Sequence, residues 1–521
     1  MWIAHSVIIF RVLSRVQEPK PDDEEGGPDS KNSTYAIIGI RQGWGPAPEQ
    51  VPLRYEVDEW YGNPANKDQI NLFFLAMSRF QSLPPDAKLS YWQVCDLSRK
   101  ALAYQAWVNG VQNNQELANN LRGLQLSQGG RFTDTLGESV YRLFSEKYFS
   151  SFSAFASTAH RQSQTPTDFS SLESIHNNIH NSVGGPNGGH MSSPAVAAFD
   201  PIFWFHHCNV DRQFAIWQAL NSDSWFEDPR EQLADPEGNW STPPGAIPTP
   251  ENTPLAPFHT DTAGTYWTSN DAREWLKYGY SYPELQQWLP KYRTGGRFNQ
   301  ELYKADIAKQ VNALYSDTRQ ILLTRGPQSS RSSRGSAGHI VSSVEGHDYV
   351  VNVAYERFAL AGLSFTIHIY IGQNTCVGTL YNFSTPAHTT GVNDGCENCR
   401  RQESGHALCT GQVPITSSLL KYVADDGVPL SSMEPEQVEA YLKKNLTWKI
   451  TKAYGEDVPV SSIPSLEVSL AVGTGCHYGD HSRLSKYHSY RVLPGCTEGR
   501  PGGYRRPNPP PPPPHAEAAF A

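Results

Sequence analysis

The sequence predicts two domains: a mainly α-helical domain with long ordered loops, followed by a C-terminal all-β, sandwich-like domain. Two observations carry this prediction. Apolar residues recur at helical spacing in the first part of the chain, whereas short runs of β-branched and aromatic residues replace them further on. A polar, basic stretch separates the two patterns. The 521 residues are enough for about two to four domains at roughly 150 residues each.

The helical domain is predicted to span residues 35–323. Helical patterns lie at Lys67–Gln81 and Thr135–Phe155, and turn-rich stretches connect them. Residues 1–34 carry an acidic, glycine-containing run that cannot bury a core, so we expect a disordered N-terminal segment. Its mildly apolar start lacks the small-residue cleavage site of a signal peptide, which leaves a cytoplasmic and a secreted location open.

A protease-sensitive linker is predicted at residues 324–345, where Arg residues are interspersed with Gly, Ser and Pro. The β domain is predicted to follow at 346–497. Its strands are expected at Tyr349–Phe358, Ser364–Ile371, Val377–Phe383, Thr447–Ala453 and Ser465–Ala471. Residues 498–521 contain a nearly continuous proline run and are predicted to form a polyproline II or disordered tail.

Charge and hydropathy exclude several classes of partner. The net charge is −9 and no basic stripe is present, which argues against nucleic acid and against an anionic membrane surface. No window reaches the run of about 20 apolar residues that a membrane-spanning helix needs. A small-molecule substrate is therefore favoured.

The densest group of chemically active residues lies in the helical domain. His176 and His180 are four residues apart, so on a helix both side chains point from one face and can bind one metal ion. Asp200-Pro201 predicts the start of a second helix, with Asp as N-cap and Pro at the first helical position. His206 and His207 then fall in its second turn. One of them can complete the metal site, while the other packs or hydrogen-bonds.

Asp211 follows His207 by four residues, where its carboxylate can orient an imidazole or pair with a neighbouring Arg. A single His-x-x-x-His pair is often just two ordinary helix histidines, but the second histidine-bearing helix makes that interpretation weaker. A zinc metalloprotease needs Glu directly after the first histidine, and Asn177 stands there. Three imidazoles without a thiolate or carboxylate ligand suit copper or zinc.

In these segments the chain resembles the fungal tyrosinases, which belong to the type-3 copper proteins with catechol oxidases and haemocyanins. The His176–His180 helix and Phe199–Arg212 are similar to the family's second copper-binding motif. Further segments that resemble the family are 40–94, Asn114–Leu124, Phe258–Asn270, Tyr278–Glu284 and 349–497. The resemblance implies a helical copper domain that a C-terminal lid domain covers in a latent proenzyme.

Carried over to this chain, the resemblance implies that His176, His180 and His207 hold the second copper, with His206 beside it. It also implies that Glu173 fixes a water and that Asn177 helps this water accept a phenol proton. Such a base is needed because free phenol has a pKa of about 10. A solvated or capping carboxylate is the other interpretation of Glu173.

The implied reaction is the hydroxylation of monophenols at the ortho position and the oxidation of o-diphenols to o-quinones, with dioxygen as co-substrate, for melanin or a related pigment. The resemblance leaves the natural phenol and the oligomeric state open.

The family's first copper motif has no counterpart in this sequence. Two coppers require six histidines, but only His5 and His160 precede His176. Family-like sequence stops at Val94 and resumes near Asn113, so the motif is missing near residues 95–112. An error in the gene model, a truncated isoform and a paralogue with one metal site all explain the gap. A non-enzymatic protein that holds one copper or zinc and an oxygen carrier of haemocyanin type therefore remain alternatives to an enzyme.

The C-terminal domain holds three further candidates. Cys396 and Cys399 form a Cys-x-x-Cys pair, which the resemblance implies for copper loading and which can equally form a disulfide or staple a loop. Phe383, at the end of a predicted strand, is our hypothesis for a side chain that plugs the copper pocket, with core packing as the alternative. Cleavage between Arg325 and Arg334 is the predicted activation step.

Overall fold

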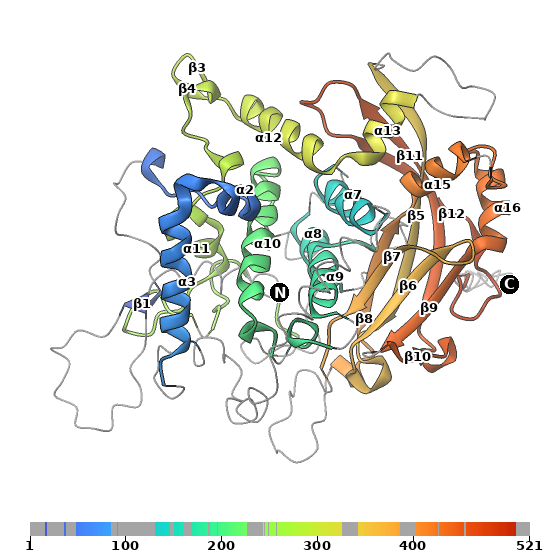
Figure 1. Ribbon diagram of the computed structural model, residues 1–521, viewed down its shortest axis with the longest axis horizontal. Coiled ribbons are helices and arrows are strands. Elements are labelled where there is room, and N and C mark those ends of the chain that lie inside the picture. The colour runs from blue at the N-terminus through green and yellow to red at the C-terminus, as the bar shows by residue number, and fades with distance from the viewer. Residues whose placement is uncertain are drawn as a thin grey trace, which may run out of the picture.

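The computed structural model describes residues 48–84, 131–145, 151–159, 169–226, 243–325, 342–385 and 402–506, with short gaps inside some of these ranges, and also 16–17, 36–37 and 91. The helices of the first domain occupy one side of the molecule, and two β-sheets with α15 (Thr416–Ala424) and α16 (Pro435–Asn445) occupy the other (Figure 1). The predicted fold class, a helical domain followed by a C-terminal β domain, is confirmed. No described helix has the length and apolar character needed to cross a membrane.

In the described part of the first domain the α-helices are α2 (Val57–Gly62), α3 (Lys67–Gln81), α7 (Arg131–Ser145), α8 (Phe152–Ala156), α9 (Leu172–Gly184), α10 (Pro201–Leu220), α11 (Ser269–Arg273), α12 (Gln300–Tyr315) and α13 (Asp317–Arg325). Its 3-10 helices include η5 (His190–Ser192) and η6 (Ala197–Phe199). Helices α2 and α3 lie at the end of the molecule far from the sheets, whereas α7, α8 and α9 lie next to the sheets (Figure 1).

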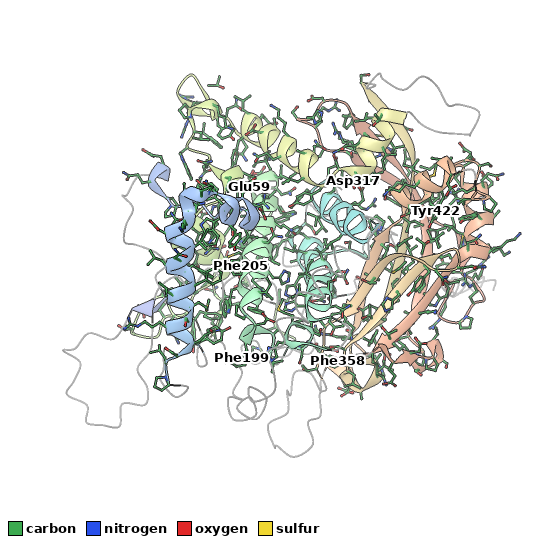
Figure 2. The ribbon with its side chains drawn as sticks, viewed as in Figure 1. Glu59, Phe199, Phe205, Asp317, Phe358 and Tyr422 are labelled. Carbon is green, nitrogen blue, oxygen red and sulfur yellow. The ribbon has the colours of Figure 1, made fainter. Side chains whose placement is uncertain are left out.

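The helix predicted at Lys67–Gln81 has these bounds in the structure. Its inner face packs on α10, where the rings of Phe73 and Phe205 have centroids 5.6 Å apart; Figure 2 shows Phe205 between the two helices. The helix predicted at Thr135–Phe155 is instead two helices, α7 and α8. The second one begins after Ser151, whose extended backbone and side chain, which accepts a hydrogen bond from Ala154 N, form an N-cap.

The described residues of the β domain form two four-stranded antiparallel sheets with the strand orders β10-β9-β6-β7 and β12-β11-β5-β8. Their strands are β5 (Ser343–Glu356), β6 (Phe365–Ile371), β7 (Thr375–Asn382), β8 (Leu408–Pro414), β9 (Leu446–Lys452), β10 (Asp457–Val458), β11 (Glu467–Tyr478) and β12 (Lys486–Val492). Val351 and Val353 of one sheet and Ile367 and Ile369 of the other belong to one buried cluster, so the sheets share a core. The short pairs β1 (Val16–Gln17) with β2 (Ala36–Ile37), and β3 (Arg293–Thr294) with β4 (Arg297–Phe298), lie outside this domain.

The sequence predicts an all-β second domain. The structure differs in this respect, because the domain also contains α15 (Thr416–Ala424) and α16 (Pro435–Asn445). Both helices bury apolar side chains, such as Leu419 and Leu442, in the core that the sheets share. Residues 498–506, which the sequence assigned to the tail, are hydrogen-bonded to the domain: Val468 N donates to Gly502 O at 2.8 Å.

A buried polar network joins the two domains. Arg142 of α7 contacts Asp348 of β5, with 2.7 Å between Nη1 and Oδ2, and both side chains are almost fully buried, at 1% and 2% exposure. The Tyr490 hydroxyl lies 2.6 Å from both the guanidinium and the carboxylate. Thr416 donates to the second carboxylate oxygen at 2.8 Å. Charges buried without such partners would cost several kcal/mol, so this network fixes how the β domain sits on the helices.

Candidate metal centre

Helix α9 carries the first two histidines, and both of its ends are defined by local sequence. Ser171 is the N-cap, and its hydroxyl accepts a hydrogen bond from Ser174 N. Gly185 ends the helix with φ = 73°, a conformation that favours glycine. His176 and His180 lie one turn apart on the buried face between these ends.

Helix α10 begins as predicted. Asp200 is its N-cap and accepts a hydrogen bond from Ile202 N, and Pro201 occupies the first helical position. His206 and His207 therefore lie in the second turn, next to α9. The four histidines of the two helices offer ligand atoms that all lie within 4.8 Å of one another, the only such metal-ligating group in the described part of the chain.

Three imidazoles converge through the same ring atom. His176 Nε2 lies 3.0 Å from His207 Nε2 and 3.0 Å from His180 Nε2. Each ring is held at its other nitrogen by an oxygen: His180 Nδ1 by Met191 O at 2.7 Å, His207 Nδ1 by Phe203 O at 2.8 Å, and His176 Nδ1 by Asn177 Oδ1 at 2.9 Å. Because these oxygens only accept, every Nδ1 carries the proton and every Nε2 presents a lone pair.

Three lone pairs that meet in a buried space repel one another unless a cation lies between them. Burial lowers the pKa of His176 to about 4 and the pKa values of His180 and His207 well below the ordinary range, so the rings stay neutral. Neutral imidazoles with their Nδ1 hydrogen-bonded to oxygen are typical metal ligands. His206 Nε2 is also buried and makes no hydrogen bond. The donor set therefore fits a transition-metal ion such as copper or zinc.

The segment after α9 is positioned by a close backbone approach. A Cβ on Gly184 would collide with Ser192 Oγ, so only glycine lets η5 pack this closely against the end of α9. This approach brings Met191 O to His180 Nδ1. Sequence reasoning missed Met191, because it contributes a backbone carbonyl and its side chain carries no signal.

The expectation that Asp211 orients an imidazole is wrong for His207, because both ring nitrogens of that histidine have other contacts. Asp211 Oδ2 accepts hydrogen bonds from the Tyr280 and Tyr282 hydroxyls, each at 2.6 Å, and lies 3.7 Å from Arg54 Nη1. The other predicted role, pairing with an Arg, is the one observed. Asp211 thus connects α10 to the segment that carries Tyr280 and Tyr282.

Glu173 and Asn177 lie on α9 beside the histidines and are buried. Glu173 Oε2 accepts hydrogen bonds from Thr158 N at 2.8 Å and Thr158 Oγ1 at 3.1 Å. Burial by itself raises the pKa of this carboxyl, but the charge of Arg357 and the Thr158 hydrogen bonds outweigh it and lower the pKa, so Glu173 is ionised. Thr158 and Arg357 carried no signal in the sequence, because they meet Glu173 only through tertiary packing.

Phe383 follows β7 and reaches the histidines from the β domain. Its ring stacks on His180 with centroids 4.3 Å apart and lies 6.0 Å from the His176 ring. Phe383 is 5% exposed, and Val183, Met191 and Phe203 of the helical domain belong to the same apolar cluster. A side chain of the second domain therefore covers the candidate metal centre.

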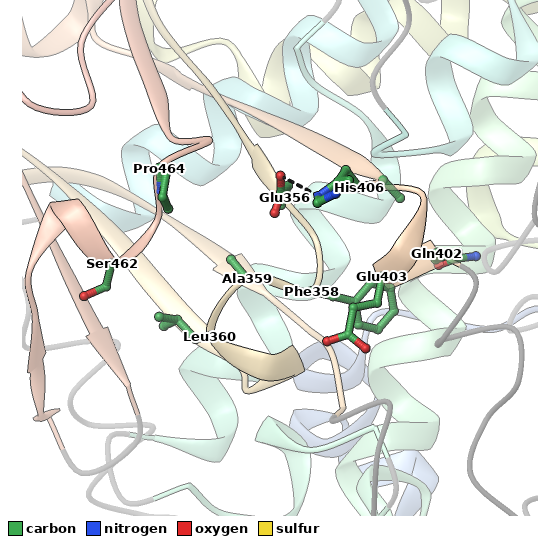
Figure 3. Close-up of a pocket in the computed structure, with 10 residues that line it drawn as sticks. Glu356, Phe358, Ala359, Leu360, Gln402, Glu403, His406, Ser462 and Pro464 are labelled. Atoms are coloured by element: carbon green, nitrogen blue, oxygen red, sulfur yellow. Dashed lines mark hydrogen bonds and ion pairs between the residues drawn. The ribbon is translucent and has the colours of Figure 1, made fainter.

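Several predicted features lie outside the described residues: Cys396, Cys399, the segment 95–112, His5, His160 and most of the linker. A separate pocket of about 270 Å³ lies in the β domain, where His406 Nδ1 and Glu356 Oε1 face each other at 3.1 Å (Figure 3). It contains none of the four clustered histidines.

The fold and the site define a protein with a buried histidine cluster that could hold a metal ion and that a C-terminal β domain covers. Family models match two parts of the chain: the common central domain of tyrosinase over residues 49–220 and the tyrosinase C-terminal domain over residues 348–470. The chain belongs to the tyrosinase family. Tyrosinases are copper proteins, and the four-histidine group is consistent with copper.

Individual relatives agree with this assignment. The chain is 35% identical over 393 residues to a tyrosinase of Aspergillus fumigatus, covering 69% of this chain and 55% of that protein. It is 28% identical over 452 residues to a tyrosinase of Neurospora crassa, covering 68% and 63%. The chain thus spans less than two thirds of either relative. The solved structure of recombinant mushroom tyrosinase has a TM-score of 0.52 at 22% identity, covers 74% of this chain and 66% of its own, and shares the fold.

Proposed function

We propose that the protein is a copper-dependent phenol oxidase, which converts monophenols and o-diphenols to o-quinones with dioxygen and is latent while the β domain covers its centre. One observation carries the proposal: three neutral imidazoles direct their Nε2 lone pairs at one buried point, under an aromatic ring of the second domain. His176, His180 and His207 would hold copper there. Bound copper would supply the electron transfer with dioxygen that side chains do not provide.

Glu173 is the proposed proton acceptor for the phenol. A phenol with a pKa of about 10 needs a base to react as phenolate at neutral pH. Glu173 supports this role because it is ionised although buried, and because it stands one turn before His176 on the same helix. Its Oε atoms would take the proton directly or through a water. Asn177 holds the His176 tautomer through the hydrogen bond to Nδ1.

Latency is proposed from the position of Phe383. A substrate ring that approaches the convergent Nε2 atoms needs the space next to His180, where the Phe383 ring now lies at 4.3 Å. The ring excludes both a phenol and water from this space. Activation then requires the β domain to move or to be released, which we propose follows cleavage in the linker between Arg325 and Arg334.

A second candidate function is a single-metal protein without oxidase activity. The observation that favours it is the count of histidines: only two precede His176 in the sequence, whereas the two coppers of the family would need three more ligands. The described residues contain one metal-ligating group, the four histidines of α9 and α10.

Copper content together with oxygen consumption separates the two candidates. The full chain is loaded with copper, cut in the linker, and assayed for copper per chain and for dioxygen uptake with 4-methylcatechol and with 4-methylphenol. About two coppers per chain with o-quinone formation would support the oxidase. One copper per chain and no dioxygen uptake, before and after cleavage, would support the single-metal protein. A His180→Ala variant serves as control for adventitious copper.

A further inference from the structure

Strand β7 is the edge strand of its sheet, and α9 lies along it (Figure 1). An edge strand presents backbone N–H and C=O groups that no neighbouring strand satisfies. Alternate residues of β7 direct these groups away from β6 and toward α9. The contacts that satisfy them therefore decide how β7, and Phe383 after it, sits on the metal-ligating helix.

One side chain satisfies two of these groups. Asn178 Nδ2 donates to Thr379 O at 2.9 Å, and Asn178 Oδ1 accepts from Tyr381 N at 2.9 Å. The primary amide takes the place that the backbone of a further strand would occupy. Among uncharged side chains only Asn and Gln offer a donor and an acceptor in this arrangement.

The same residue lies between two proposed metal ligands. Asn178 stands on α9 between His176 and His180, and Phe383 follows Tyr381 by two residues. The Tyr381 hydroxyl adds a buried hydrogen bond of 2.6 Å to Ser192 O, in the segment that also holds His180. A shift of β7 along α9 would therefore move the Phe383 ring off His180.

We propose that Asn178 is a positioning residue, which holds Phe383 over the histidine cluster through its two hydrogen bonds to the backbone of β7. The inference rests on the proposed latency under the β domain. Asn178 contacts no substrate and binds no metal; it acts only through the strand that carries Phe383. Loss of its amide is expected to loosen this strand locally while the rest of the domain stays in place, because the buried Arg142–Asp348 network holds the domain elsewhere.

The chain offers a matched control at Asn181. This residue lies on α9 three positions later, and its Nδ2 donates to Thr366 Oγ1 of β6 at 3.2 Å. Asn181→Ala thus removes an amide that also joins α9 to the same sheet but does not hold the strand of Phe383.

Hydrogen–deuterium exchange on the full chain tests the proposal without metal or turnover. In Asn178→Ala the amide of Tyr381 is expected to exchange about fivefold to tenfold faster, the size of one lost hydrogen bond. Asn178→Asp keeps the size and the acceptor but loses the donor, so an intermediate effect is expected. Asn181→Ala should leave this amide unchanged. Unchanged exchange in Asn178→Ala, or an equal effect of Asn181→Ala, would overturn the proposal.

Metal accessibility gives the second readout. The full chains are loaded with Zn²⁺, and its removal by excess EDTA is followed with a colorimetric indicator. Asn178→Ala should bind as much zinc as the unmodified chain but release it about tenfold faster, and Asn181→Ala should release it at the unmodified rate. Equal release rates in all chains would overturn the proposal. If no form of the protein oxidises phenols, the proposed function fails, whereas the exchange and release results still decide the role of Asn178.

Discussion

The ion pair between Arg142 and Asp348 offers the most direct test of how the two domains are joined. We consider Asp348→Asn, which keeps the shape of the side chain and removes its charge. In the folded protein this carboxylate accepts hydrogen bonds from Arg142 at 2.7 Å, from Tyr490 at 2.6 Å and from Thr416 at 2.8 Å. These partners lower the pKa of Asp348 against the effect of burial, which itself raises it, so the side chain is ionised.

The substitution leaves the Arg142 guanidinium buried without its counter-charge. Removal of one partner from a buried ion pair costs about 3–5 kcal/mol. Both side chains are at most 2% exposed, so water cannot replace the lost partner and the full cost is expected. The side-chain NH2 group of the introduced Asn would also point its hydrogens at a group that donates to the Asp348 carboxylate in the unmodified chain. We therefore expect the free energy of unfolding to fall by about 3–5 kcal/mol.

The assay is urea-induced unfolding of the full chain, followed by circular dichroism and by tryptophan fluorescence. Glu498→Gln, which removes the partner of Arg506 in an exposed ion pair, is the matched control and should leave the transition nearly unchanged. The double variant Arg142→Met with Asp348→Asn should recover part of the loss, because no buried charge is left unpaired. A loss below about 1 kcal/mol for Asp348→Asn, as for a surface pair, would refute the reasoning.

Three further predictions follow from the site and its surroundings. Burial raises the pKa of Glu138 from 4.5 to about 7, so this carboxyl contributes stability below about pH 4.5 that is lost as the pH rises through 7. In urea titrations the stability of Glu138→Gln relative to the unmodified chain should therefore increase by about 3 kcal/mol between pH 4.5 and pH 8. A pH-independent difference would contradict this prediction. Phe383→Ala should reduce the free energy of unfolding by about 3–5 kcal/mol and let benzoate bind to the metal-loaded full chain in calorimetry, whereas benzoate binding to the unmodified chain with equal affinity would exclude a plug. His207→Ala should abolish metal binding and His206→Ala should retain it, as measured by metal content per chain; loss in both would make His206 a fourth ligand.

Local sequence predicted the elements whose signals lie within a few residues. The start of α10 follows from Asp200-Pro201, since an N-cap and a proline at the first position act inside one turn. The start of α8 depends on a similar local signal, the N-cap at Ser151. The prediction of one continuous helix was wrong there because it relied on apolar periodicity and overlooked this cap. Strand β8 and helix α15 were missed because both depend on burial in the core shared by the sheets rather than on a strong local pattern.

The sequence by itself determined that His176 and His180 share one face of a helix, because helical spacing fixes the direction of side chains within a helix, and that a second helix starts at Asp200-Pro201 and carries His206 and His207 in its second turn. It also placed Phe383 at the end of a strand. Only the tertiary structure decided what surrounds these residues. Met191 O fixes the tautomer of His180, Tyr280 and Tyr282 donate hydrogen bonds to the carboxylate of Asp211, and Phe383 stacks on His180 of a helix far earlier in the chain. Such contacts arise when separate elements bury their polar and apolar surfaces together, and no pattern within a single element encodes them.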